Sequence, residues 1–508
     1  MKSEKLKNYL SFVTEKIRIE YWILFLIFVT GAILRLKGIT FQSLWFDELM
    51  SVTWSAPKLS FAKIISIYQH DPHPPLFPLL LHYWMCLFGY TDWAARLLTA
   101  LIGCGSVYSI YLLGKESFNR QTGLIASLII ALNYFNLYYS HEVRSYILLF
   151  LLTTLSYTFL LKLLREQTKK HMVFYSVITA LMLYTHYFGL VTLIAQAIFL
   201  LFYLIFGKGT SRPNLLKYFS LSGILIVVLY SPWIPTMLKM MKKSSHWTKA
   251  PGSDFFVTLF KLYFGREDFL LLLFSVLMLS AFFYLVLPKQ NDKSNENNHA
   301  RLNLSLPVLF SWLFFTLFIP YYRSLASVPM YSHYYSIGTL AAVVVLAAVG
   351  ITFIKNNTFK ALIISAIILV SFTSILHRLD YYNKVTKEDW RGAAEYVVKK
   401  HTERYGDQKI YIIARYAFSY NFYFETMGAQ VHSQKPNVKL LKNLLKRNAK
   451  EGKDISGLWV LSSHNYEPDR RFMDYMARNF RQIEKKEIKK GWIMLFEPKK
   501  NKRSESSR

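Results

Sequence analysis

The sequence predicts an all-α polytopic membrane protein that ends in a small soluble α/β domain. Hydrophobic residues make up 53% of its 508 residues and charged residues only 18%, whereas globular domains carry roughly 25% charged residues. Aromatic residues reach 17%, and amphipathic rings collect at membrane interfaces. From Arg378 onward the apolar runs stop and the composition becomes that of a soluble domain.

The membrane part contains about 11 candidate spans, because a helix needs about 20 mainly apolar residues to cross hydrocarbon with its backbone polar groups satisfied. They lie approximately at 20–37, 94–114, 121–138, 145–164, 172–186, 187–207, 216–235, 268–288, 303–320, 333–354 and 358–377. The first run has a basic leader and lacks an A-x-A-like site, so it is predicted to be an anchor and not a cleaved signal.

Short basic loops predict the orientation. The leader and every second loop after it are rich in Lys and Arg, which places them in the cytoplasm by the positive-inside rule. They carry Lys2, Lys5, Lys7, Lys16, Arg18, Lys115, Arg120, Arg165, Lys169, Lys170, Lys208, Arg212, Lys217, Lys289, Lys293, Arg301, Lys355 and Lys360. The loop 38–93 and the tail then face outward. The basic loop 236–267 and the basic tail fit the rule badly, although long segments cross largely regardless of charge.

The chain therefore divides into four predicted parts. They are a cytoplasmic basic leader (1–19), a multi-pass domain (20–377), an outward-facing α/β domain (378–498) and a disordered basic tail (499–508). The predicted location of the protein is the cell (inner) membrane. In the α/β domain, helices are predicted at Trp390–Lys400 and Arg470–Phe480, and strands at Lys409–Ala414, Leu458–Ser462 and Trp492–Phe496.

Charge and cysteine content exclude several classes. The net charge of +30 could indicate nucleic acid, but the Lys and Arg residues lie mostly between apolar runs and in the last quarter of the chain. Anionic lipid is the expected partner, and no nucleic acid. The two cysteines, Cys86 and Cys104, exclude a disulfide scaffold and a cysteine-based zinc or iron–sulfur site.

Two titratable clusters lie in the first outward loop. Asp47 and Glu48 stand between aromatics, and adjacent carboxylates there are costly to desolvate unless they hold a proton, a cation or a substrate hydroxyl. A helix N-cap is the alternative. The second cluster contains Asp71 and His73 among prolines, which alone would make a rigid helix entry. Together these residues, with Asp47, Glu48 and His73 foremost, could ligate a divalent metal ion, although the spacing matches no dedicated motif.

A third cluster, Tyr138 to Tyr146, lies at the outer junction of the third and fourth spans. Arg144 presents a charged planar fork suited to phosphate, and the alternative is a snorkelling arginine paired with Glu142. Weaker candidates are His186, a lone histidine among aromatics, and the tyrosine-rich segments near Arg323 and His333, which an aromatic belt would explain. The basic loop containing Lys239, Lys242, Lys243, His246, Trp247 and Lys249 could attract phosphate, although charge runs usually solvate a face.

The predicted topology places all of these clusters on one side of the membrane. This arrangement indicates an active site at the outer interface that receives a lipid-anchored substrate. Its polar head would lie by Asp47, its phosphate by Arg144 and its tail between helices.

An ordered set of motifs resembles a known family. The motifs are SLWFDE (43–48), DPHPPLF (71–77), LLHYW (80–84), TDWAARLLTALIG (91–103), YYSHEVRSYILLFL (138–151), YTHYFGL (184–190), a VP–HYY segment (328–335) and KEDWR (387–391). In this order they resemble the GT-C glycosyltransferases that use polyprenyl-phosphate sugars, in the bacterial branch related to protein O-mannosyltransferases and aminoarabinose transferases. The resemblance is strong over about 30–200 and patchy over 200–377.

The resemblance implies a GT-C-like fold and an inverting transfer from a polyprenyl-phosphate sugar to a hydroxyl of a protein, lipid or glycan. Asp47 would be the general base, Arg144 would offset the charge of the leaving phosphate, and the remaining residues would orient or ligate. The set is Glu48, His73, Tyr139, Glu142, His186 and Tyr334. Relatives differ at His141 and His333, so neither is given a role.

Two other classes remain as alternatives. A transporter or flippase of lipid-linked sugars would share basic grooves and outward aromatics, but transporters place polar residues at the bilayer midplane in broken helices, and here the polar groups gather on one face. A membrane-anchored binding module would use the C-terminal domain, in which no catalytic constellation is recognisable.

Overall fold

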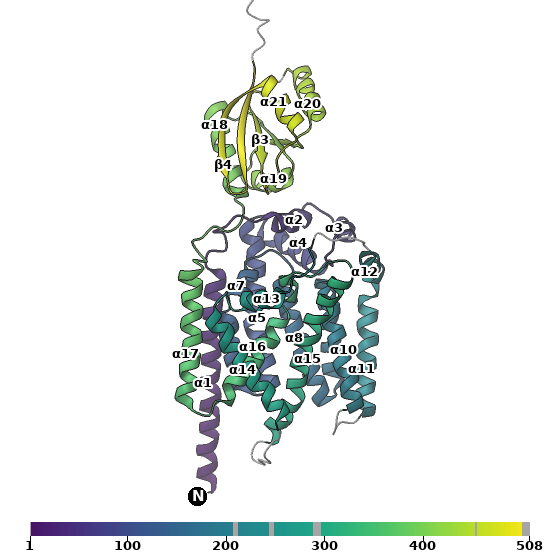
Figure 1. Ribbon diagram of the computed structural model, residues 1–508, viewed down its shortest axis with the longest axis vertical. Helices are drawn as coiled ribbons and strands as arrows, with labels where there is room; N and C mark the ends of the chain where they lie inside the picture. Colours follow the sequence, from purple (N-terminus) through teal and green to yellow (C-terminus); the bar gives the residue numbers. More distant parts are fainter. Residues whose placement is uncertain (1, 207–211, 243–247, 288–295, 453–454, 500–508) are drawn as a thin grey trace, which may run out of the picture. The chain divides into compact units, whose positions relative to one another are not determined.

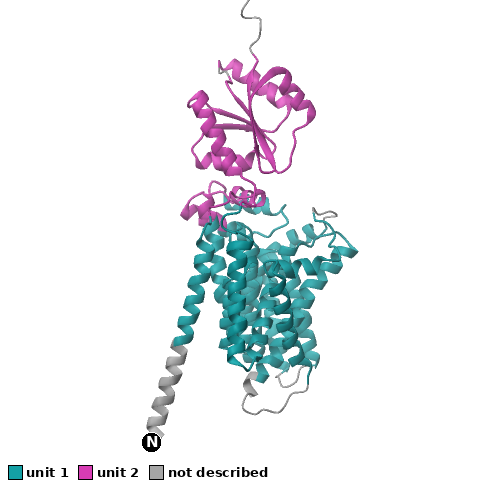
Figure 2. Cartoon of the chain, turned by 60° about the vertical axis from the view of Figure 1, so that its left-hand side comes forward, with its two compact units in different colours: residues 1–39, 60–80, 96–384 teal, residues 40–59, 81–95, 385–508 magenta. Residues whose placement is uncertain are grey.

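The computed structural model describes residues 2–206, 212–242, 248–287, 296–452 and 455–499, and the side chains from residue 19 onward except those of 296–298. The chain forms two compact units, coloured separately in Figure 2. Unit 1 contains residues 1–39, 60–80 and 96–384, and unit 2 contains 40–59, 81–95 and 385–508. The predicted disordered tail 499–508 and the residues Lys243, His246 and Trp247 lie almost wholly outside the described residues.

Unit 1 is a bundle of long helices that run roughly alongside one another (Figure 1). Within the described residues, eight helical segments are long and apolar enough to cross a membrane. They are α1 (Lys2–Leu36, apolar from Ile19), α5 (Asp92–Ser117), α8 (Tyr146–Glu166), α10 (Phe188–Phe206), α11 (Arg212–Tyr230) with η1 (Ser231–Trp233) and α12 (Ile234–Met241), α14 (Asp268–Val286), α15 (Glu296–Ala326), and α17 (Asn357–Thr373) with the π-turn η4 (Ser374–Arg378). The chain is a multi-pass membrane protein, as predicted.

The predicted span 121–138 is not one continuous helix. It consists of α6 (Arg120–Ala131) and α7 (Tyr134–Ser140), bent by 62°. Asn133 caps α7 by accepting from Asn136 N, and the Arg35 guanidinium of α1 donates to the carbonyls of Ile130 at 2.9 Å and Ala131 at 3.2 Å. The break between α6 and α7 is tolerated in an apolar environment because the Arg35 guanidinium donates to the carbonyls that the break leaves without helical partners.

The other two predicted spans are short helices, α9 (Lys169–Thr185) and α16 (Thr339–Phe353). Nearly every residue of α16 is buried, and its apolar run is therefore typical of a helix enclosed by protein. A Cβ at Gly350 would lie 2.3 Å from the Leu277 carbonyl oxygen of α14, so glycine permits the close approach of these two helices.

The predicted loops also contain helices. Those between α1 and α5 are α2 (Phe46–Trp54), α3 (Phe61–Tyr68) and α4 (Leu76–Phe88), and α13 (Phe255–Tyr263) lies in the predicted loop 236–267. The predicted span 333–354 begins with the short helix η3 (His333–Ser336). The prolines of the segment 72–75 precede α4, as expected for residues that favour a helix start.

Unit 2 contains a five-stranded sheet of order β2-β1-β3-β5-β4. Strands β1 (Ile410–Ala414), β2 (Val431–Gln434) and β3 (Leu458–Ser462) are parallel, and β4 (Phe480–Ile488) and β5 (Gly491–Pro498) form an antiparallel hairpin against β3. The helices are α18 (Trp390–Tyr405), α19 (Ala417–Thr426), α20 (Val438–Lys450) and α21 (Arg470–Asn479). The α/β fold class predicted for the tail is confirmed, with its predicted strands at β1, β3 and β5.

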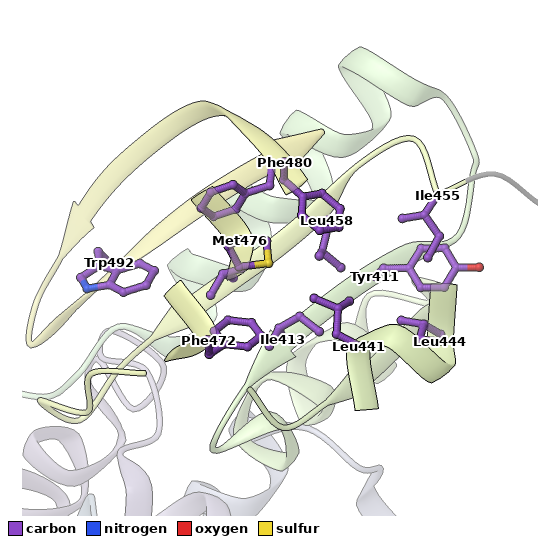
Figure 3. Packing of buried hydrophobic residues seen from close by; sticks show 12 residues of the cluster. Tyr411, Ile413, Leu441, Leu444, Ile455, Leu458, Phe472, Met476, Phe480 and Trp492 are labelled. Atoms are coloured by element: carbon purple, nitrogen blue, oxygen red, sulfur yellow. The ribbon is translucent and has the colours of Figure 1, made fainter. Parts of the chain in front are cut away.

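Figure 3 shows the core on one side of this sheet. Side chains of α20 and α21 pack against those of the central strands, and each residue is at least nine-tenths buried. The cluster consists of Tyr411, Ile413, Leu441, Leu444, Ile455, Leu458, Val460, Phe472, Met476, Phe480, Trp492 and Phe496. Unit 2 therefore has a hydrophobic core of its own.

Candidate functional site

The two adjacent carboxylates of the first loop have different environments, both within unit 2. Glu48 is fully buried, and its Oε2 accepts from the backbone N of Trp45 at 3.1 Å and from Lys387 Nζ at 2.8 Å. It therefore closes the first turn of α2 and forms a buried ion pair. Asp47 is half-buried one position earlier, on a different side of the same helix. The N-cap position of α2 is Trp45, so Asp47 is not the cap.

Asp71, His73 and Arg144 are brought together in unit 1. Asp71 Oδ1 accepts from the backbone N of His73 at 3.0 Å and lies 2.7 Å from its Nδ1, while His73 Nε2 lies 3.1 Å from Arg144 NH2. A guanidinium can only donate, so His73 Nε2 is the acceptor and Nδ1 carries the proton that is donated to Asp71. The chain of bonds fixes His73 as one neutral tautomer and orients Arg144.

Asp71 remains ionised in this cluster. Burial disfavours its charged form, but the hydrogen bonds from the His73 side chain and backbone and the charge of Arg144 outweigh that effect and hold the pKa of Asp71 below its usual range. A charged Asp71 keeps the proton of His73 on Nδ1, and the acceptor atom Nε2 therefore stays directed at the guanidinium.

His186, at the turn between α9 and α10, lies beside this cluster. Its ring centroid is 5.4 Å from that of His73 and 4.8 Å from that of Tyr335. Its Nδ1 accepts from the backbone N of Phe188 at 3.1 Å, so Nε2 carries the proton. Nε2 is buried and has no hydrogen-bond partner among the described residues. A cavity of about 70 Å³ adjoins it, lined by Pro72, His186, Tyr187, Phe188, Thr248, Met330 and Tyr335.

Aromatic side chains surround Arg144. The Tyr146 ring centroid lies 5.9 Å from the guanidinium carbon, and the rings of Tyr334 and Tyr139 lie 4.9 and 5.4 Å from that of Tyr146. Tyr139 is 8% exposed and Glu142 3% exposed. The predicted set Arg144, Glu142, His73, Tyr139, His186 and Tyr334 therefore belongs to unit 1, and the rings of Tyr139 and Tyr334 form part of the aromatic surround of Arg144.

His141, for which no role was predicted, has structural partners on both ring nitrogens. Nε2 lies 2.7 Å from the Arg35 carbonyl oxygen, and Nδ1 lies 2.9 Å from the Tyr381 hydroxyl. His333 stacks on Phe255 with 4.3 Å between ring centroids. Neither ring is among the contacts of Arg144 described above.

The possible metal site of Asp47, Glu48 and His73 stays a prediction. Asp47 and Glu48 belong to unit 2 and His73 to unit 1, and the charge of Glu48 is balanced by Lys387. Within the described ranges, no three His, Cys, Asp or Glu side chains form a group that could hold a metal ion.

Comparisons with known proteins address the family and the fold. Residues 72–235 match the family model described as dolichyl-phosphate-mannose-protein mannosyltransferase. The matched range contains His73, Arg144 and His186, and Asp47 precedes it. No curated protein matches the chain.

Solved structures share the fold over nearly the whole chain. ArnT from Cupriavidus metallidurans in the apo state is 12% identical with a TM-score of 0.61, and the match covers 95% of this chain and 98% of that chain. The same protein bound to undecaprenyl phosphate is 10% identical with a TM-score of 0.60 and the same coverage, 95% and 98%. The archaeal oligosaccharyltransferase AglB from Archaeoglobus fulgidus, in complex with an inhibitory peptide and a dolichol-phosphate, is 10% identical with a TM-score of 0.54, covering 88% and 70%.

The chain shares the fold of these proteins, and the likeness extends through the C-terminal α/β domain, since 95% of the chain is covered. Identities of 10–12% carry no residue roles with them, so the roles of the residues have to be argued from this chain's own geometry.

Sequence reasoning missed two cations of unit 2. Lys387 forms the ion pair with Glu48, and Arg391 NH1 donates to Asp92 Oδ2 at 2.9 Å. Their partners are about 300 or more positions away in the chain, so no local pattern indicates them. The only signal was the position of both residues in the motif KEDWR.

Proposed function

We propose that the protein transfers a sugar from a polyprenyl-phosphate donor to a hydroxyl acceptor with inversion at the anomeric carbon, at the outer face of the cell membrane. Asp47 is the general base and Arg144 binds the donor phosphate. One observation carries the proposal: in a chain with the GT-C fold, the ring of His73, which accepts from the Arg144 guanidinium, lies 5.4 Å from that of His186, whose buried Nε2–H has no partner among the described residues.

The phosphate role rests on chemistry that this cluster offers. Phosphate oxygens only accept hydrogen bonds, and Arg144 and the Nε2–H of His186 only donate. A phosphate oxygen would therefore satisfy the buried donor that has no partner in the described structure. Two of the structures with a similar fold hold undecaprenyl phosphate and a dolichol-phosphate, which agrees with this class of ligand.

The base role is better suited to Asp47 than to Glu48. Glu48 is fully buried and ion-paired with Lys387, and a base must reach the proton that it removes. Asp47 is half-buried on a short helix whose first turn Glu48 fixes. The adjacent carboxylates thus divide the work: Glu48 holds the helix, and Asp47, which is only half-buried, acts on the acceptor hydroxyl.

The reaction balances as a single displacement. Asp47 takes the proton of the acceptor hydroxyl, and the oxygen forms a bond to the anomeric carbon on the face opposite the phosphate. The bond from that carbon to the phosphate oxygen breaks, and its electron pair leaves on polyprenyl phosphate. Arg144 and His186 stabilise the charge that develops on this leaving group. The sugar and the acceptor class stay open, with mannose as the first candidate because of the family model.

The test is transfer from a panel of radiolabelled polyprenyl-phosphate sugars in membranes that contain the protein. The wild type should form a glycosidic bond, and Asp47→Asn should reduce transfer by about 10²–10⁴-fold, as is typical for loss of a general base, while donor binding is retained. Asp268→Asn, which changes a carboxylate with 75% side-chain exposure, is the matched control and should be active. Translocation without any bond formation by the wild type would identify a transporter instead.

A further inference from the structure

The segment that carries Asp47 is joined to the C-terminal domain as part of one compact unit. Residues 40–59 and 81–95 cluster with 385–508 in unit 2 (Figure 2, magenta). A loop with a catalytic role was expected to belong with the membrane helices that flank it in the sequence. Its inclusion in unit 2 raises the question of what holds it there.

Lys387 and Arg391 make the charged contacts. Lys387 Nζ donates to Glu48 Oε2 at 2.8 Å, with side-chain exposures of 8% and 0%. Arg391 donates to the carbonyls of Thr40 at 2.8 Å and Phe41 at 3.2 Å and to Asp92 Oδ2 at 2.9 Å. Arg391 thus joins the two loop segments of unit 2 to each other as well as to α18.

Neutral contacts fix the residues between these points. The Tyr423 hydroxyl accepts from the backbone N of Leu44 at 2.8 Å and lies 3.1 Å from Ser43 Oγ, which itself accepts from the backbone N of Arg391 at 3.1 Å. Gln42 Oε1 accepts from the backbone N of Thr386 at 2.8 Å. The backbone leading to Asp47 is therefore held at nearly every residue from 40 to 48.

Aromatic side chains of the C-terminal domain pack against Phe46, the residue before Asp47. The ring of Phe46 stacks on His464 with 4.8 Å between centroids and meets Tyr416 edge-on at 4.9 Å. Asp47 lies between Phe46 and Glu48, and both of these neighbours are anchored in C-terminal residues. A displacement of the C-terminal contacts would therefore move the Asp47 carboxylate.

We propose that the C-terminal domain positions the general base, with Lys387 and Arg391 as the positioning residues. This inference rests on the proposed function of Asp47. It assigns the α/β domain a part in catalysis without any catalytic residue of its own: the domain sets where the carboxylate on α2 points. Because misplacement of a catalytic group by about 1 Å can cost about 10²-fold in rate, the contacts affect turnover more than donor binding.

The test compares Lys387→Met with Lys58→Met in the full-length protein. Lys58 also pairs across the same two segments, with Glu425 at 3.0 Å, but the side chains are 64% and 48% exposed, so its loss should change nothing measurable. Lys387→Met should lower kcat by at least about tenfold, up to about 10²-fold, with the KM for the donor unchanged. Deuterium exchange over 46–54 should rise in Lys387→Met and stay unchanged in Lys58→Met.

A second pair of variants separates positioning from stability. Glu48→Gln combined with Lys387→Met removes both buried charges, so the melting temperature should return toward that of the wild type while kcat stays low. Lys387→Arg keeps the charge and should recover part of kcat. Recovery of full turnover by the double variant would overturn the positioning role, as would normal kcat and normal exchange over 46–54 in Lys387→Met.

Failure of the two proposals can be told apart. If Asp47→Asn keeps its turnover, the base assignment fails, but raised exchange in Lys387→Met would still show that the C-terminal domain holds α2. If Asp47→Asn is inactive and Lys387→Met behaves as the wild type in both readouts, the base assignment stands and the positioning inference fails.

Discussion

Replacing Arg144 by lysine tests the phosphate site most directly, because the charge is kept while the planar fork is lost. In the structure one nitrogen of the guanidinium donates to His73 Nε2 at 3.1 Å, which leaves the other N–H groups oriented by that bond. A lysine ammonium is a compact head on a flexible stem. It cannot keep the His73 bond and also present two parallel N–H groups to a phosphate.

The magnitude follows from the bonds at stake. A hydrogen bond to a charged group contributes about 1.5–3 kcal/mol, and about 1.4 kcal/mol corresponds to a factor of ten in Kd. Losing one such bond to the donor phosphate should therefore weaken donor binding by about 10- to 100-fold. Arg144→Ala, which loses the charge as well, should be weaker still. Melting temperatures of both variants in detergent should remain close to that of the wild type.

The assay is competition between labelled donor and free polyprenyl phosphate, read as transfer and as binding. Free polyprenyl phosphate should compete well on the wild type and poorly on both variants, because the defect concerns the phosphate and not the sugar. Arg120→Lys is the matched control, since Arg120 pairs with Glu20 at 3.0 Å with its side chain 40% exposed, and such pairs contribute about 0–1 kcal/mol. Near-normal transfer by Arg144→Lys would refute the reasoning and direct attention to Lys239, Lys242 and Lys249.

Three further predictions concern stability and orientation. The pKa of Asp71 is depressed, so its charge stabilises the folded state above the unfolded pKa of about 3.9. The melting temperature of Asp71→Asn should therefore be lower than that of the wild type at pH 5–8, and the difference should shrink as the pH falls below about 4. An unchanged difference at pH 3 would contradict this prediction. Gly350→Ala should destabilise by about 1–3 kcal/mol, because its Cβ would lie 2.3 Å from Leu277 O, whereas Gly223→Ala, with open space around it, is a control for thermal melting. With the exposed Cys86 first changed to Ser, an impermeant thiol reagent should label cysteine at Ser60 or Asn465 from outside and not at Lys355; the reverse pattern would invert the proposed orientation.

Helix existence in the membrane part could be predicted because apolar length is a local property of the sequence. The breaks could not. The bend between α6 and α7 depends on Arg35 from another helix, which donates to the carbonyls of Ile130 and Ala131. Asn133 was the only local signal, as a residue that favours caps. Similarly, α16 is as apolar as a span but is a short enclosed helix, and apolar composition is the same for burial in protein and in lipid.

In the C-terminal domain the buried strands β1 and β3 were predictable as continuous apolar runs, whereas β2 and β4 were missed. Strand β2 is short and polar, and β4 carries mainly charged residues along an exposed edge. Edge strands tend to lack a regular apolar pattern, because an exposed apolar edge would pair with other chains. The helix α20 was also missed, although its leucines recur at 440, 441, 444 and 445, a helical spacing that predicts burial of one face.

At the site, residue types were predictable and their partners were not. Arg144, His73 and Asp47 were identified by composition and predicted side of the membrane. That Glu48 is neutralised by Lys387, and that His73 receives a bond from Arg144, depends on contacts between distant parts of the chain. Composition alone did not distinguish Asp47 from Glu48, and only the family resemblance did, because the helical turn that separates their environments exists only in the fold.

Buried charge within the helices of unit 1 bears on the choice between an enzyme and a transporter. Arg35 and Arg96 are 0% and 1% exposed, and ionisable groups at membrane depth are by default candidates for a transport path. Arg35, however, donates to backbone carbonyls at the α6–α7 break and to Asn136 Oδ1 at 2.6 Å, and Arg96 NH1 donates to the Ile39 carbonyl at 2.9 Å. These bonds terminate helices and support bends, and a charge committed to backbone carbonyls is poorly suited to release and rebind a moving solute. Arg144 differs because it donates to the ring nitrogen of His73, whose tautomer Asp71 fixes and whose ring lies 5.4 Å from that of His186. Charge positioned in this way favours holding one anionic group in place while a bond to it breaks.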